Sequence, residues 1–267
     1  MMLGKAVRLE RILNRDTGKT VIVPMDHGVT VGPIEGLVDM RSMVNFVAEG
    51  GANAVLGHVG LPLHGHRRYG RDIGLILHLS GSTVWSPDPN AKILVNTVEN
   101  ALRMGADGIS IHINIGAESE TEMLQDLGRV SVKCIEWGVP LLAMMYTRGK
   151  KVGSESNPDA VKHAARIAAE MGADLVKVTY TGSPQSFRQV VEGCPIPVLI
   201  AGGEKAKSDR QVLKTVKDVL SVGGAGVCIG RNSFQHKTPI RMIQAICALV
   251  HEDATVAAAA KILKGRS

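Results

Sequence analysis

Aromatic side chains are scarce in this sequence, at 3% of the residues. Proteins that bind single-stranded nucleic acid stack the bases on such side chains. No basic run reaches five residues, and Lys and Arg are interspersed with Asp and Glu, although the formal net charge is +6. We therefore expect no nucleic-acid partner, because a small anionic substrate accounts for the basic excess equally well.

Cysteine is also rare and widely spaced. The chain has four, at Cys134, Cys194, Cys228 and Cys247, with no C-x-x-C pair. Each has apolar neighbours, which is typical of reduced cysteines in a protein core and not of a disulfide framework or a zinc site.

Long apolar runs are missing as well. No segment is long and apolar enough to be a membrane span, and the N-terminal MMLGKAVRLERIL contains no signal-peptide cleavage site. We expect a cytoplasmic protein with no membrane partner.

One phrase recurs along the chain, a glycine-alanine pair before an alternating apolar run. Its copies are GGANAVLGH (50–58), MGADGISIH (104–112), MGADLVKVT (171–179) and GGAGVCIG (223–230). Each copy follows an amphipathic segment, so we expect a helix that ends at glycine and then turns into a strand. Four more strands fit the intervals, at 20–26, 75–80, 139–146 and 197–203.

Eight strands alternating with helices predict an α/β fold, a parallel (β/α)8 TIM barrel. The alternative is a doubly wound open sheet, but the chain after its first strand reads DHGVTVGPIEG and lacks the G-x-G-x-x-G spacing. No proline- or serine-rich linker divides the chain. We expect one barrel domain over residues 1–267, with an N-terminal extension and an extra C-terminal helix at TVAAAAKIL.

The strand in GADLVKVTYTG contains a lysine, Lys177, between two valines. If Val176 and Val178 face the helices, Lys177 points toward the barrel axis. We expect burial to lower the pKa of Lys177, because desolvation disfavours the ammonium. A neutral amine adds to a ketone and forms a Schiff base. A structural role, with Lys177 paired to a buried carboxylate or extended to the rim, is the alternative.

Two other polar side chains stand at strand ends, where barrel enzymes do their chemistry. Tyr146 ends the strand before that of Lys177, and Asp26 follows the first strand. Cleavage through a Schiff base needs a proton shuttle, which these two groups can supply. Lys177, Tyr146 and Asp26 are therefore the predicted catalytic residues.

The last two strand ends predict a phosphate site. IAGGEK places Gly202 and Gly203 after the seventh strand, and CIGRNSF places Gly230 and Arg231 after the eighth. Glycines let backbone N–H groups approach a phosphate, and barrels often bind phosphate at these two loops. The arginine adds a fork of donors. The alternative is that these glycines only permit turns.

Histidines offer a competing interpretation, a metal-dependent aldolase. The candidates are His58, His64, His66, His78 and His112. No H-x-x-x-H pair or carboxylate-bearing ligand motif accompanies them, so we expect no metal and no cofactor.

With these residues in place, the sequence resembles the archaeal-type class I aldolases over essentially its whole length. The most specific motifs are VPMDHGVTVGP, HGHRRYGRDIGLILHLS, SPDPN, LLAMMYTRG, VKVTYTG, VLIAGGEK and GVCIGRNSFQH. The resemblance implies that Lys177 forms the Schiff base, that Tyr146 donates a proton and that Asp26 accepts one. Implied substrate contacts are Asp26, His27, Gly28, Val29, Thr30, Tyr146, Thr147, Arg148, Lys177, Gly202, Gly203, Gly230 and Arg231. Thr147 departs from the family pattern, which has proline there.

The resemblance also implies a reaction and an assembly. A ketone unit would pass from 1-deoxy-D-threo-hexo-2,5-diulose 6-phosphate to L-aspartate 4-semialdehyde, on an alternative route to 3-dehydroquinate and aromatic amino acids. The expected partners are this phosphosugar, the aldehyde and further copies of the chain, often ten. A class I fructose-bisphosphate aldolase and a non-catalytic phosphosugar-binding barrel are the alternatives.

The basic segment HGHRRYGRD offers a place for the acceptor aldehyde. We expect Arg67, Arg68 and Arg71 to bind its carboxylate and Asp72 its ammonium, with Arg148 beyond Tyr146. A solvated face or a subunit contact is the alternative.

Overall fold

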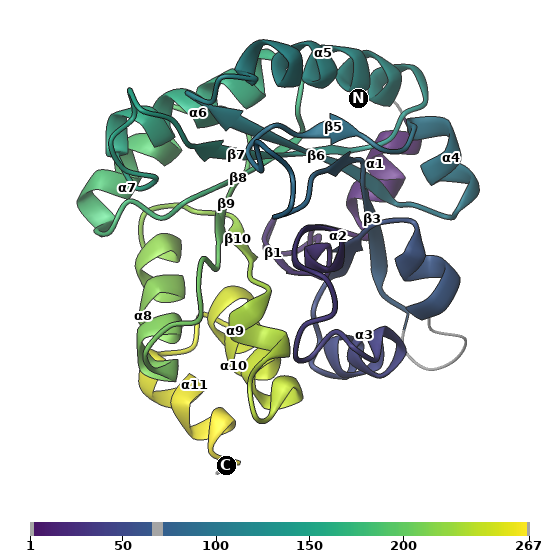
Figure 1. Cartoon of the computed structure of the whole chain (residues 1–267). Coiled ribbons are helices and arrows are strands. Elements are labelled where there is room, and N and C mark those ends of the chain that lie inside the picture. The colour runs from purple at the N-terminus through teal and green to yellow at the C-terminus, as the bar shows by residue number, and fades with distance from the viewer. Residues whose placement is uncertain (1–2, 66–71, 266–267) are drawn as a thin grey trace.

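Eight parallel strands form a closed barrel in a computed structural model that describes residues 3–65 and 72–265 (Figure 1). Their order around the barrel is β1-β10-β9-β8-β7-β6-β3-β2. The bounds are β1 Thr20–Pro24, β2 Ala54–Gly57, β3 Gly74–His78, β6 Gly108–Ile115, β7 Leu141–Thr147, β8 Leu175–Val178, β9 Val198–Ala201 and β10 Gly226–Cys228. The prediction of a (β/α)8 TIM barrel is confirmed.

Helices surround the barrel (Figure 1). They are α1 Leu3–Leu9, α2 His27–Val31, α3 Met40–Glu49, α4 Val98–Arg103, α5 Glu120–Glu136, α6 Pro158–Glu170, α7 Pro184–Glu192, α8 Asp209–Leu220, α9 Arg231–Phe234, α10 Pro239–His251 and α11 Val256–Leu263, with a π-helical turn, η1, at Leu61–Gly65. Within the described residues, no helix has the length and apolar character needed to cross a bilayer.

Helix α6 shows how the sequence sets these elements. The side chain of Asn157 caps its first turn by accepting from the backbone N–H groups of Asp159 and Ala160. The buried residues Val161, Ala164, Ala165 and Ala168 recur at helical spacing and pack one face onto the barrel.

The recurring glycine-alanine phrase has a structural cause at the amino ends of the strands. Gly105 and Gly172 have φ of 85° and 86°, the left-handed region that favours glycine after a helix. The residue after the alanine then accepts a hydrogen bond from a neighbouring strand: Asn53 from Val21 N–H, Asp107 from Leu75 N–H and Asp174 from Leu141 N–H. The phrase thus fixes the register of adjacent strands.

Alternate residues of each strand face opposite sides, as expected. The isoleucines of β6 and both valines of β8 belong to the core between the strands and the helices. A second cluster fills the barrel interior, with Ile12 among Ile22, Leu56 and Leu199. Lys177 lies at an inward position of β8, opposite Met144 of β7.

A small hairpin between β3 and β6 was not predicted. Strands β4 (Ser80–Gly81) and β5 (Ile93–Leu94) pair antiparallel. The connecting loop is bound to the barrel mouth, because Asn90 O accepts from the Asn114 side chain at 2.7 Å and Val84 N–H donates to Thr30 O at 2.9 Å. The hairpin therefore brings residues 82–92 to the carboxyl ends of the strands.

Candidate active site

A cavity of about 520 Å³ lies at the carboxyl ends of the barrel strands. It brings together most of the predicted site residues, namely Asp26, His27, Thr30, Tyr146, Arg148, Lys177, Gly202, Gly203, Gly230 and Arg231. Gly28, Val29 and Thr147 do not line it. Thr147 is buried and its hydroxyl donates to Glu155 O, whereas Val29 is exposed.

Lys177 is 5% exposed, at the base of this cavity. Its Nζ lies 3.4 Å from the sulfur of Met144 and 5.9 Å from the ring centroid of Tyr146. No carboxylate of the described residues lies within ion-pair distance of this amine. Because the side chain is buried and lines the cavity, its amine can react with a molecule bound there.

The expected direction of the Lys177 pKa shift was wrong. Burial lowers the pKa of Lys177, but the acidic groups of Cys228, Tyr146 and Asp26 together outweigh burial and raise it above the ordinary value. The prediction was wrong because the sequence indicates that the strand is buried but does not show which acidic groups surround the amine. The ammonium must therefore lose a proton before Lys177 can act as a nucleophile.

Asp26 stands just before α2, on the β1 side of the cavity. Burial alone raises the pKa of its carboxyl, yet the positive groups of His78, His27, Lys177 and His58 lower it to about 2. Asp26 is thus the ionised acid of the site near neutral pH. Its Oδ1 lies 3.6 Å from His27 Nδ1.

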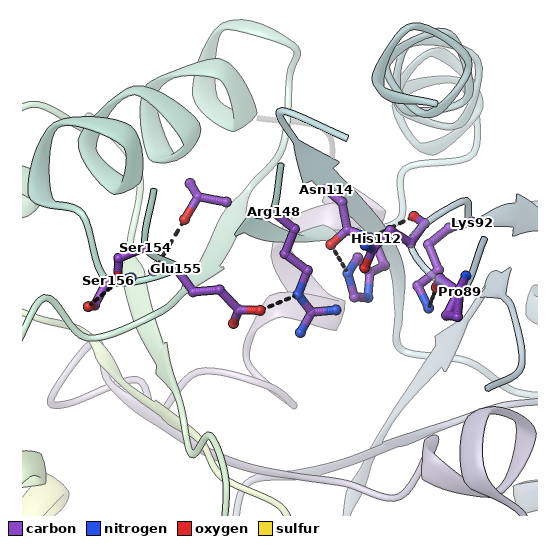
Figure 2. A network of polar contacts seen from close by, with 10 residues as sticks. Pro89, Lys92, His112, Asn114, Arg148, Ser154, Glu155 and Ser156 are labelled. Carbon is purple, nitrogen blue, oxygen red and sulfur yellow. Dashed lines mark hydrogen bonds and ion pairs between the residues drawn. The ribbon is translucent and has the colours of Figure 1, made fainter. Parts of the chain in front are cut away.

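Tyr146 of β7 contacts Arg148 and His112, two members of the polar network that Figure 2 shows. The guanidinium of Arg148 lies 4.8 Å from its ring centroid, and the His112 ring lies 4.8 Å away, centroid to centroid. His112 Nε2 contacts Asn114 Oδ1 at 2.8 Å. Burial holds the pKa of His112 well below its usual value, so this ring is neutral and can orient Tyr146 without competing for its proton.

Lys92 is a cavity residue that the sequence did not predict. It is only 8% exposed, and its Nζ donates to Pro89 O at 3.0 Å and to the hydroxyl of Ser82. Its segment SPDPNAK has the composition of a solvated loop. The burial arises from the β4–β5 hairpin, and that pairing has no strong sequence signal.

Gly203, Gly230 and Arg231 lie together on the β9–β10 side. A Cβ at Gly230 would lie 2.8 Å from His27 Cε1 and 3.1 Å from Pro24 O, so a larger residue would have to displace the His27 ring. The Nε of Arg231 is buried and has no hydrogen-bond partner among the described residues. An anion in the cavity would supply one.

Of the residues expected to bind the acceptor aldehyde, Arg148 lines this cavity, and Asp72 does not. Arg67, Arg68, Arg71 and His66 lie outside the described residues. Asp72 pairs with Arg11 at 2.7 Å, before the start of β3 and at the opposite end of the barrel from the cavity, so its expected contact with the substrate ammonium was wrong.

Of the other histidines, His58 and His78 line the cavity with His112, whereas His64 does not. Burial lowers the pKa of His58 and lowers that of His78 to about 3. Among residues 3–65 and 72–265, no three His, Cys, Asp or Glu side chains are grouped as metal ligands.

A barrel with a buried lysine, a tyrosine and an aspartate around one cavity at its strand ends is the architecture of a lysine-dependent, class I aldolase. The chain belongs to the DeoC/LacD family of aldolases, whose family model matches residues 20–236. The family resemblance and the class of enzyme drawn from the motifs are thereby confirmed.

Individual relatives are similar over nearly the full length. The chain is 44% identical to the 2-amino-3,7-dideoxy-D-threo-hept-6-ulosonate synthase of Halobacterium salinarum, over 96% of this chain and 95% of that protein. It is 40% identical to the 2-amino-4,5-dihydroxy-6-oxo-7-(phosphonooxy)heptanoate synthase of Streptomyces griseus, over 96% and 93%. An archaeal fructose-1,6-bisphosphate aldolase structure, with its catalytic lysine bound to the carbinolamine intermediate, superposes with a TM-score of 0.84 at 31% identity, over 92% of this chain and 99% of that one.

Proposed function

We propose that the chain transfers a ketone fragment from 1-deoxy-D-threo-hexo-2,5-diulose 6-phosphate to L-aspartate 4-semialdehyde, giving 2-amino-3,7-dideoxy-D-threo-hept-6-ulosonate. The observation that carries the proposal is the buried Lys177, which shares one cavity with Tyr146 and Asp26. The 44% identity to the Halobacterium salinarum synthase supports this product over that of a fructose-bisphosphate aldolase. The product feeds the alternative route to 3-dehydroquinate and aromatic amino acids.

In the proposed reaction, deprotonated Lys177 adds to carbon 2 of the donor and loses water to give an iminium. The C3–C4 bond then breaks, its electrons pass to the iminium, and the proton on the C4 hydroxyl leaves. Dioxopropyl phosphate departs and a three-carbon enamine stays on Lys177. The enamine attacks the acceptor aldehyde, the new alkoxide takes a proton, and water hydrolyses the iminium to free the product and Lys177.

The proton transfers fall to the other two catalytic residues in this proposal. Tyr146 exchanges the proton of the C4 hydroxyl and of the new alkoxide, and Asp26 accepts protons while the iminium forms. The remaining predicted contacts, including Gly202, Gly203, Gly230 and Arg231, bind the phosphosugar.

A second candidate function keeps the phosphate on the transferred fragment. The product of the Streptomyces griseus relative carries a phosphate at carbon 7, beside its ketone at carbon 6. The unpartnered Nε of Arg231 and the close-packed Gly230 offer an anion site in the same cavity as Lys177. They favour this candidate because only here does the fragment that stays on Lys177 carry a phosphate. A ketone phosphate such as dihydroxyacetone phosphate would then be the donor.

One experiment separates the candidates. Each donor is incubated with L-aspartate semialdehyde, and the products are analysed by mass spectrometry for a seven-carbon amino acid with or without phosphate. Borohydride added to the donor alone should trap an adduct on Lys177, absent in Lys177→Ala. Efficient cleavage of fructose 1,6-bisphosphate with no seven-carbon amino acid would refute both candidates and favour the aldolase. Ligand-induced stabilisation with no turnover would favour the binding barrel.

We also propose a cytoplasmic homo-oligomer, a decamer by family resemblance. Large apolar side chains at the surface support assembly, among them Trp85 (91% exposed), Ile93 and Trp137. Sedimentation analysis of the purified chain tests the proposal, and a monomer at micromolar concentration would refute it.

A further inference from the structure

The cavity has a cation at each of two ends that face one another across the barrel. In the closed strand order, β9 and β10 lie opposite β3 and β6. Arg231 follows β10, whereas Lys92 belongs to the hairpin after β3 and is close enough to His112 of β6 to lower its pKa. Lys177, Tyr146 and Asp26 come from the strands that lie between these two ends.

Lys92 is an unusual residue for a cavity wall. Lysine is seldom buried without a carboxylate, because desolvation of the ammonium is costly. Here both hydrogen-bond acceptors are neutral, and no carboxylate of the described residues lies within ion-pair distance. The nearby Arg148 adds a like charge, and burial together with Arg148 lowers the pKa of Lys92. The site is built to receive an anion.

An acid stands beside these cations. Arg148 Nε donates to Glu155 Oε1 at 2.7 Å, and Glu155 is half-exposed and also lines the cavity. Figure 2 shows Arg148 between Glu155 and Lys92 in this view. A carboxylate accepts several hydrogen bonds, so Glu155 can hold Arg148 and a second cation together. The cavity end therefore offers both charges, as a zwitterion requires.

We propose that Lys92 and Arg148 bind the α-carboxylate, and Glu155 the α-ammonium, of the amino-acid aldehyde that accepts the ketone fragment. This inference rests on the proposed function and names its acceptor site. It holds for either donor, because both candidate products are 2-amino acids with a carbon–carbon bond formed at carbon 4.

The position of Tyr146 selects this end of the cavity. The acceptor's aldehyde oxygen becomes a hydroxyl, so its proton donor must lie beside the acceptor. Tyr146 contacts Arg148 and His112, which belong to the Lys92 end. A released dioxopropyl phosphate occupies the same end before the acceptor, since both react at the same enamine carbon. The phosphate of this fragment can bind Lys92, but the fragment has no ammonium group to pair with Glu155. This difference favours its replacement by the zwitterionic acceptor.

The first test substitutes Lys92→Met, with Lys214→Met on the exposed face of α8 as the control for loss of one positive charge. We expect the KM for L-aspartate semialdehyde to rise about 30-fold in Lys92→Met, the effect of losing a charged hydrogen bond. The KM for succinate semialdehyde, which retains the carboxylate, should rise similarly. The KM for propanal, which lacks it, should change less than about 3-fold when the donor is saturating.

The second test substitutes Glu155→Gln, which keeps the size of the side chain and removes its charge. The KM for L-aspartate semialdehyde should rise about 5-fold, because the pair is half-exposed, while that for succinate semialdehyde stays near the wild-type value. A structural disturbance of the loop would raise both, so the pair of acceptors separates recognition of the ammonium from misfolding.

The outcomes separate this inference from the function on which it rests. A wild-type enzyme that makes no seven-carbon amino acid from either donor overturns both. Two results with an active enzyme overturn the acceptor site alone. One is an unchanged KM for L-aspartate semialdehyde in Lys92→Met, and the other is a rise of this KM in Arg231→Met instead. An equal rise for propanal in Lys92→Met also overturns the acceptor site, since it shows that the hairpin itself has moved.

Discussion

The side-chain amide of Asn232 donates to the carbonyl oxygen of Gly202 across 3.0 Å and so joins the loop after β9 to helix α9. The same amide donates to Glu204 O at 3.0 Å, and its Oδ1 accepts from Ala206 N–H at 2.8 Å. Asn232 is 6% exposed. One buried side chain therefore positions both loops of the proposed phosphosugar site.

Replacing this side chain should loosen both loops. We expect Asn232→Ala to lower the free energy of unfolding by about 3 kcal/mol, because it leaves buried backbone groups without partners. The KM for the phosphosugar should rise, and the factor by which it rises should be about 10 times the factor by which kcat falls. The reason is that the residue positions the site and does not react. Urea unfolding and steady-state kinetics measure the two effects. An unchanged KM in a destabilised variant would assign Asn232 to stability alone.

Gly230 permits a close approach to His27 and Pro24 that a Cβ would crowd. We expect Gly230→Ala to lower the free energy of unfolding by about 2 kcal/mol, because the new methyl would overlap His27 and the backbone of Pro24. Borohydride trapping with the phosphosugar should need a higher donor concentration. The matched control is Gly128→Ala within α5, where the methyl meets only Met171 Cε at 3.6 Å. This control should stabilise the protein by about 1 kcal/mol. A stable Gly230→Ala with unaltered trapping would contradict the role of the close approach.

The strands and the inward direction of Lys177 were predictable because they follow local rules. Gly172 ends a helix, Asp174 fixes the register, and the alternation of Val176 with Lys177 assigns the faces. These signals lie within a few residues of each other in the chain. The fold was therefore available from the sequence.

The environment of the site was less predictable because it depends on distant contacts. The pKa of Lys177 depends on Cys228, which the sequence marks only as a core cysteine. The burial of Lys92 depends on a hairpin of two short strands and on the bond from Asn114 to Asn90. Cys228 is far from Lys177 in the sequence, and Asn114 is far from Lys92, so local sequence patterns do not show these contacts.

Cys228 should control the pH at which Lys177 reacts. Among its neighbours, this group does most to raise the pKa of Lys177, and burial raises the pKa of the thiol itself to about 11. We expect adduct trapping to increase with pH above neutrality. Cys228→Ala should move the alkaline part of that profile to lower pH, because the thiolate that favours the ammonium forms only near pH about 11. Cys194→Ala is the control, because its thiol bonds Ala165 O away from the cavity. A shift toward higher pH in Cys228→Ala would show that the thiol does not raise the lysine pKa.

His78 should make the fold sensitive to acid. It is 3% exposed, its Nδ1 contacts Ser110 Oγ at 2.8 Å, and burial lowers its pKa to about 3. Below pH about 6.5 the unfolded chain binds a proton at this histidine that the folded chain does not bind until pH about 3. The free energy of unfolding is therefore fully retained above pH about 6.5 and falls with pH below it, by about 2 kcal/mol from His78 at pH about 5. Urea unfolding across this range measures the slope, which should be shallower in His78→Gln. His163→Gln, at an exposed position of α6, is the matched control. A slope in His78→Gln as steep as in the wild type would mean that other groups govern the loss of stability in acid.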